Sequence, residues 1–150
     1  MIETWIDALA RVWEIPDGRG GALKSYRLFE IDEFPSTISV FPSAISYVTG
    51  VQAMYDAASA IDLWTGITEI HCFPENKSRM AEALRYFERI KAAAAANITL
   101  GGLVSYFLLT QDAGQNIIGP VSLEYGDAAP NTGFVVHWTV KENVTTVVGG

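Results

Sequence analysis

The first fourteen residues carry apolar side chains at the spacing of one face of a helix. Such a stripe, recurring every three or four residues, predicts an amphipathic helix that packs on a core. The segment 15–21 then holds a proline and three glycines, which predict a turn after the helix. The apolar positions of the helix are Ile2, Trp5, Ile6, Leu9, Val12 and Trp13.

A second helical pattern covers residues 77–96. Asn76 or Ser78 fits the N-cap and Asn97 fits the stop, while five alanines at 92–96 leave the last turns thin enough for close packing. Ser78, Glu82, Arg85 and Arg89 fall on the opposite, polar face. The apolar face is predicted to consist of Met80, Ala83, Leu84, Phe87, Ile90 and Ala94.

Two Phe-Pro pairs, at 34–35 and 41–42, punctuate a run that otherwise reads as strand. Proline cannot donate to a strand ladder and is confined to strand ends, edges and bulges. The pairs therefore predict a short strand over Ser36–Phe41. A second run, 44–54, follows at once, so that the two runs form either a tight hairpin or one bent strand.

Further extended segments follow in the second half of the chain and at its end. The run 61–73 contains Gly66, which predicts a bulge or a strand contacted on both faces. The continuously apolar run 103–110 predicts a central strand. Residues 117–125 and 134–140 alternate polar and apolar side chains, which predicts an antiparallel hairpin joined by a loop. Residues 23–31 are predicted to form either a strand or an irregular segment before the next strand. The β-prone tail 143–150 is predicted to be either frayed or paired with another subunit.

These patterns predict one domain over residues 1–150. Its fold class is α+β, with an antiparallel-dominated sheet packed by the 77–96 helix and the N-terminal amphipathic helix. A chain of 150 residues is long enough to bury a real core without metal or disulfide staples.

The net charge and the amino-acid composition limit the kinds of molecule that the chain is expected to bind. A net charge of −7 is the opposite of what a phosphate-binding surface needs, so we expect neither sequence-specific nucleic-acid binding nor an anionic membrane partner. The chain is 49% hydrophobic and only 18% charged, which indicates apolar surface that meets a partner. Cys72 is the only cysteine, and no signal peptide or membrane-spanning run is recognisable, so we expect an intracellular origin.

Few residues in the sequence are candidates for metal binding or catalysis. His71, His137 and Cys72 are the only nitrogen or sulfur metal donors, and adjacent His71 and Cys72 point to opposite faces of a strand, so we expect no metal and no cofactor. Glu69 and His71 lie two apart on one face, a spacing that an acid–base pair could use. The same face is as consistent with a solvated surface or an interface.

Interface candidates come from turns, the polar helix face and the tail. The turn at 17–21, the loop at 127–132 and the segment 144–148 are predicted to be exposed, and helix arginines can form ion pairs between subunits. The four tryptophans are predicted to lie mainly in the core, and one or two of them are predicted to lie at an interface. The candidates are Asp17, Gly18, Arg19, Arg85, Arg89, Asp127, Asn131, Val144 and Val147.

The order of elements and three short strings resemble one family. Phe34 and Pro35 enter a strand in "DEFPSTISV", Glu69 to Pro74 lead into the long helix in "TEIHCFPEN", and the last strand reads "FVVHWTVKE". Over most of residues 1–142 the chain resembles the tail terminator and tail-completion proteins of long-tailed, siphophage-type bacteriophages. Head–tail connector proteins share much of this pattern.

The resemblance implies a structural virion protein and no enzyme. It implies a homohexameric ring that caps the tail tube at the head-proximal end of the virion, stops tube polymerisation and joins the tube protein to a neck or head-completion protein. The protein would be made in the host cytoplasm, and DNA would pass through an acidic ring without binding it. The alternatives are a head–tail connector or minor tail protein, a small enzyme or ligand-binding domain using Glu69 and His71, and an α+β domain unrelated to phage.

Overall fold

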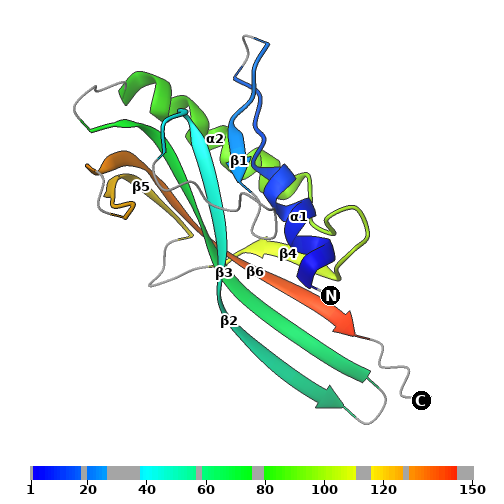
Figure 1. Cartoon of the computed structure of the whole chain (residues 1–150). Helices are drawn as coiled ribbons and strands as arrows, with labels where there is room; N and C mark the ends of the chain where they lie inside the picture. Colours follow the sequence, from blue (N-terminus) through cyan, green and yellow to red (C-terminus); the bar gives the residue numbers. More distant parts are fainter. Residues whose placement is uncertain are drawn as a thin grey trace.

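The fold is α+β, and the described part of the chain forms two helices and a mixed, mostly antiparallel, curled sheet of six strands (Figure 1). The computed structural model describes residues 2–17, 20–26, 38–56, 59–75, 80–110, 116–126 and 129–144. The elements are α1 (Ile2–Val12), β1 (Lys24–Tyr26), β2 (Ser43–Asp56), β3 (Ser59–Pro74), α2 (Met80–Ala95), β4 (Tyr106–Leu109), β5 (Ile117–Leu123) and β6 (Asn131–Val144).

Three long antiparallel strands, β2, β3 and β6, form the middle of the sheet. β1 pairs parallel with the start of β2, and β4 and β5 both pair with β6 along different stretches. The hairpin expected from the alternating segments at 117–125 and 134–140 is confirmed as the antiparallel pair of β5 and β6.

An extra residue, Thr49, interrupts the ladder between β2 and β3. The register passes from Val48 opposite Gly66 to Gly50 opposite Thr65. The irregularity expected at Gly66 is thus present, with the extra residue in the partner strand. Such a β-bulge shifts the alternation of side chains by one position.

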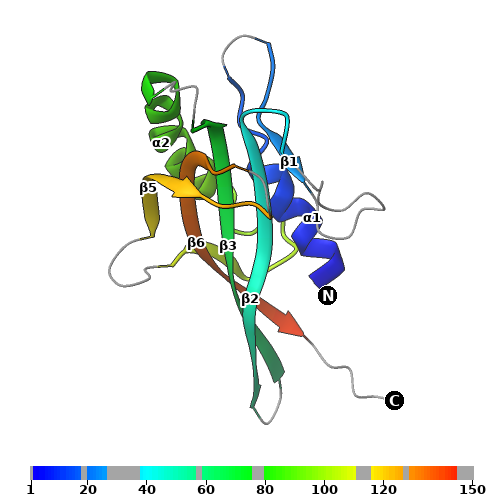
Figure 2. The ribbon, with the colours of Figure 1, turned by 60° about the vertical axis from the view of Figure 1, so that its left-hand side comes forward.

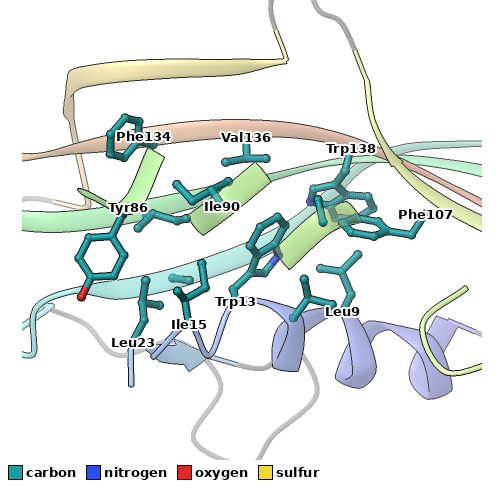
Figure 3. Packing of buried hydrophobic residues seen from close by; sticks show 14 of the residues in the cluster. Leu9, Trp13, Ile15, Leu23, Tyr86, Ile90, Phe107, Phe134, Val136 and Trp138 are labelled. Atoms are coloured by element: carbon teal, nitrogen blue, oxygen red, sulfur yellow. The ribbon is translucent and has the colours of Figure 1, made fainter. Parts of the chain in front are cut away.

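Both helices pack on the same face of the sheet, here called the helix face. Along the strands it is formed by alternate residues, and Ile70, Phe134 and Trp138 among them are fully buried. Figure 3 shows side chains of α1, α2 and β6 interleaved in this layer. Each large apolar side chain buried there contributes roughly 1.5–3 kcal/mol.

The predicted face of α1 is confirmed. Trp5, Leu9 and Trp13 are fully buried, and Ile6 and Val12 are nearly so. Only Ile2, at the first turn, is partly exposed. Large aromatic residues at helical spacing fixed this orientation, because no other face of α1 offers comparable apolar area.

The predicted face of α2 is partly wrong. Its buried residues are Ala83, Tyr86, Ile90 and Ala94, whereas Met80, Leu84 and Phe87 are exposed. The alanines let the helix backbone approach a sheet already filled with aromatic rings, which bulkier side chains would prevent. Tyr86 buries its ring there because its hydroxyl can stay at the rim. None of the helices in the described ranges is long and apolar enough to span a membrane.

The prediction of a strand over Ser36–Phe41 is wrong for residues 38–41, which are the part of it that the structure describes. Residues 38–42 form no strand, and β2 begins only at Ser43. Pro42 uses its carbonyl oxygen to accept a hydrogen bond from the Lys24 amide, 3.2 Å away. This segment is therefore a connection next to β1, and neither a hairpin nor one bent strand is formed. The first Phe-Pro pair lies outside the described residues.

The central strand expected over 103–110 is also wrong. β4 covers only Tyr106–Leu109 and pairs along a single edge, with β6. Leu103 lies in an exposed turn that follows three residues with positive φ, Leu100, Gly101 and Gly102. The apolar run is thus divided between a turn, the buried Phe107 and an exposed Leu108.

The middle strands continue past α1 as a projecting arm (Figures 1 and 2). We define the arm as residues 50–56 of β2 and 59–65 of β3, flanked by the end of β6. After the bulge, Val51, Ala53 and Tyr55 lie on the side of the helix face, because Val51 pairs with the core-packed Trp64. Val51 and Tyr55 are 54% and 80% exposed.

Gly66→Ala should destabilise the fold by about 3 kcal/mol, because a Cβ there would meet the Trp138 ring and lie 2.7 Å from the Tyr47 carbonyl oxygen. Gly50→Ala is the matched control in the same sheet, since its Cβ would meet only the Thr65 hydroxyl at 3.3 Å. Its cost should be below about 1 kcal/mol. Urea unfolding measures both free energies, and equal losses would contradict the close packing at Gly66.

Candidate functional site

The acid–base candidates Glu69 and His71 are brought together on the face of the sheet opposite the helix face. The distance from His71 Nε2 to Glu69 Oε1 is 3.1 Å. Both side chains leave β3 on one side, as their spacing of two residues requires. Cys72 turns the other way and belongs to the apolar core beside Tyr86.

Two residues that the sequence reading did not assign to this pair complete a hydrogen-bonded network. The Tyr47 hydroxyl donates to Glu69 Oε2 at 2.7 Å, and Asn131 Nδ2 lies 3.0 Å from His71 Nδ1. The Tyr125 ring packs edge-on against the imidazole, with centroids 5.9 Å apart. The pairing register of β2, β3 and β6 brings Tyr47 and Asn131 to this pair. That register includes β-bulges in the β2–β3 and β3–β6 ladders, which the sequence does not reveal.

The contacts assign protonation states to the network. Because the Asn131 amide donates to His71 Nδ1, the proton of a neutral imidazole lies on Nε2 and is donated to Glu69. Burial raises the pKa of Glu69, but hydrogen bonds from His71 and Tyr47 outweigh it and leave the pKa lowered. Burial and the bond to the Glu69 carboxylate raise the pKa of Tyr47.

The arrangement is better suited to holding strands than to proton transfer with a substrate. His71 has no exposed surface and both of its ring nitrogens have partners within the chain. The network joins β2 through Tyr47, β3 through Glu69 and His71, and β6 through Asn131. It therefore ties the three strands that run on into the arm.

No metal site is formed by the described part of the chain. Within those residues no group of three or more histidine, cysteine, aspartate or glutamate side chains lies close enough to hold an ion. Burial raises the pKa of the Cys72 thiol to about 12, so little reactive thiolate is present near neutral pH.

Three predicted interface residues, Asp17, Arg85 and Arg89, meet around one cavity of about 200 Å³ beside α2. Glu82 also lines the cavity, so two acids accompany the two arginines and offset their attraction for an anion. Arg89 donates to the Pro16 carbonyl oxygen at 3.0 Å and thereby holds the turn against α2. Asp17 itself closes that turn by accepting from the Gly21 amide at 3.1 Å.

The other interface candidates are placed differently. Asn131 is not in an exposed loop: it is buried at the start of β6, where the amide partner of His71 is needed. Val144 ends β6 and pairs with Ala60, so this part of the tail continues the sheet of its own chain. Gly18, Arg19, Asp127 and Val147 lie outside the described residues.

The arm is the apolar surface that the residue-by-residue reading missed. Residues 49–55 of β2 include no charged side chain, and Val51, Met54 and Tyr55 are exposed. Of the four tryptophans, Trp5, Trp13 and Trp138 are fully buried, while Trp64 at the base of the arm is only partly buried. A strand segment of seven residues without a charged side chain, 49–55, in an acidic chain is the sequence signal that could have indicated this surface.

Comparison of the chain with models of known protein families and with curated protein sequences gave no match.

Glu69→Gln should lower the free energy of unfolding by about 1–3 kcal/mol at pH 7, because it removes the charged acceptor of two hydrogen bonds. Since the folded-state pKa is below the ordinary value of 4.5, this stabilisation is present above about pH 4.5 and is lost as pH falls through the folded-state pKa. Urea unfolding at pH 7 and pH 3 should therefore show the gap between variant and parent closing in acid. Glu124→Gln, at an exposed position, controls for loss of charge alone, and a gap of equal size at both pH values would contradict the network.

Proposed function

We propose that this chain is a non-enzymatic assembly protein that forms a ring on the end of a bacteriophage tail tube. In this role it stops tube polymerisation and offers the joining surface to the neck or head. The family resemblance supports a hexamer placed at the head-proximal end of the virion, with the tube protein and a neck or head-completion protein as its partners. A head–tail connector or minor tail protein would use the same surfaces in a different ring.

The observation that carries this proposal is the projecting arm. The arm is three-stranded, because β3 pairs there with β2 on one edge and with the end of β6 on the other. Here Val51 and Tyr55 on one face and Met54 on the other stay exposed in the single chain. A surface of this kind is typical of a protein that reaches a neighbouring molecule.

Charge supports the same proposal. Copies of a chain with net charge −7 repel one another, so association is favoured where acidic side chains are few. The stretch 49–55 carries no charged side chain, and Asp62 opposite Ala53 is the acid beside it on the same face. The remaining acidic surface would keep DNA from adhering while it passes through the ring.

The second candidate, an enzyme or ligand-binding domain, is favoured only by the Glu69–His71 pair. His71→Gln keeps a hydrogen-bond donor for Glu69 and removes acid–base chemistry. An assembly protein with this change should form the same oligomers and cap tubes as before. Loss of capping by a folded, oligomeric variant would instead assign a direct role to the pair.

Val51→Asp should weaken self-association by more than about tenfold, because burying an unpaired carboxylate in an interface costs more than ~1.4 kcal/mol. Val40→Asp is the matched control, since Val40 is 52% exposed but lies outside the arm. Native mass spectrometry of both variants gives the oligomer distribution. Electron microscopy of the tube protein from the same genome, polymerised with each variant, gives the tube lengths.

The parent protein and Val40→Asp should form rings and shorten tubes, and Val51→Asp should do neither. A parent protein that stays monomeric and leaves tube length unchanged would overturn the proposed function. Equal loss of assembly in both variants would show that the arm has no special role in the proposed ring.

A further inference from the structure

One backbone edge of β2 is open along the arm. Beyond Ile45, where its pairing with β1 ends, β2 pairs within the described residues with β3 only. The amide and carbonyl groups of such an edge form a template for another strand, and edge strands usually avoid this pairing through charged side chains or proline. Residues 50–55 of β2 contain neither. This edge is therefore suited to accept an extended segment of polypeptide.

The other edges of the described sheet are less suited to strand addition. β1 and β4 have only three and four residues, and β5 contains Pro120, which has no amide hydrogen to donate. Beyond its pairing with β4, β6 has three residues left, and they include the acidic Glu142. The edge of β2 along the arm is thus the longest one in the described sheet without charge or proline.

The segment that fits this edge is 145–148, which directly follows β6. It consists of two threonines and two valines, which are β-branched residues that favour strands, and it carries no charge. An uncharged segment on an uncharged edge avoids the repulsion between copies of a chain with net charge −7. Val144 faces Ala60 in the register and β3 begins at Ser59, so β3 has only one residue left for this segment to pair with.

Residues 145–148 are unable to occupy the β2 edge of their own molecule. β2 and β6 run in the same direction toward the tip of the arm, with β3 between them (Figure 1). A strand on the outer edge of β2 would lie three strand spacings, about 14 Å, from β6. Four residues span at most about 14 Å when fully extended. All four would be needed for the crossing, so the β2 edge that they can pair with belongs to another copy.

We propose that residues 145–148 of one copy add as a strand to residues 50–55 of β2 in a second copy. The inference rests on the proposed ring and names a contact that builds it. The added segment and the accepting edge are different parts of the chain, and every copy carries both. The contact is therefore heterologous and repeats from copy to copy, as a ring requires. Main-chain hydrogen bonds supply the affinity in contacts of this kind.

Proline in the added segment tests this contact. Val147→Pro removes an amide donor that the added strand needs. Gly149→Pro is the matched control, because it lies after the added segment. Both positions follow the end of β6 at Val144, so both variants should keep the parent's free energy of unfolding in urea. Native mass spectrometry over a dilution series gives the oligomer distribution, and amide hydrogen exchange in concentrated and dilute samples gives the protection of residues 50–55.

Val147→Pro should weaken self-association by at least about tenfold, and Gly149→Pro should leave it unchanged. In the parent protein, assembly should slow the exchange of alternate amides in 50–55 by at least about tenfold, because these amides point away from β3. Packing of side chains alone would not select alternate amides. Val147→Pro should lose this protection, and Gly149→Pro should keep it.

Four outcomes would overturn this contact and leave the ring intact. They are oligomers whose 50–55 amides exchange as in the dilute sample, protection that does not change on dilution, self-association of Val147→Pro equal to that of the parent, and equal weakening by Gly149→Pro. Monomers at every concentration of the parent protein would overturn both this contact and the proposed ring.

Discussion

The packing of Trp138 over the backbone of Gly66 is the contact on which the other elements depend. The Trp138 ring packs edge-on against Trp5 at 6.0 Å and tilted against Phe107 at 6.4 Å, so that α1 and β4 meet β6 at one point. Its indole nitrogen donates to the Thr68 hydroxyl at 3.0 Å, which in turn bonds the Ser46 hydroxyl at 2.8 Å. A side chain at position 66 would push this ring away. The helix layer and the three middle strands are thus aligned by a glycine that leaves room for an indole.

The opposite face of the sheet is stabilised by a different kind of contact. There the Tyr47, Glu69, His71 and Asn131 side chains join the strands through hydrogen bonds. Directional hydrogen bonds of this kind fix strand register as well as adding stability. Aromatic packing on one face and a polar network on the other together hold the root of the arm, so that an extended hairpin can project from a firmly held base.

An element could be predicted from the sequence where its pattern of apolar side chains allows only one buried face. The α1 stripe holds two buried tryptophans, and no other orientation buries them, so its face was predictable. α2 offers Met80, Leu84 and Tyr86 as competing apolar groups, and only the space left by the sheet decides that Tyr86 goes inside. The Glu69–His71 pair follows from strand spacing alone. Its partners Tyr47 and Asn131 come from other strands, through a register that contains a bulge on each side of β3.

The bulge at Thr49 has a consequence for how the arm can change over time. Upstream of it, odd-numbered residues of β2 such as Ile45 and Tyr47 point away from the helix face, while downstream Val51 and Tyr55 lie on the side of the helix face. Loss of the single codon for Thr49 would leave Val48 opposite Gly66 and Val51 opposite Trp64, so the arm would keep its two faces and lose only the local bend and added twist of the bulge. One extra residue therefore sets the direction in which the arm projects, while pairing with β3 sets which side chains the arm presents.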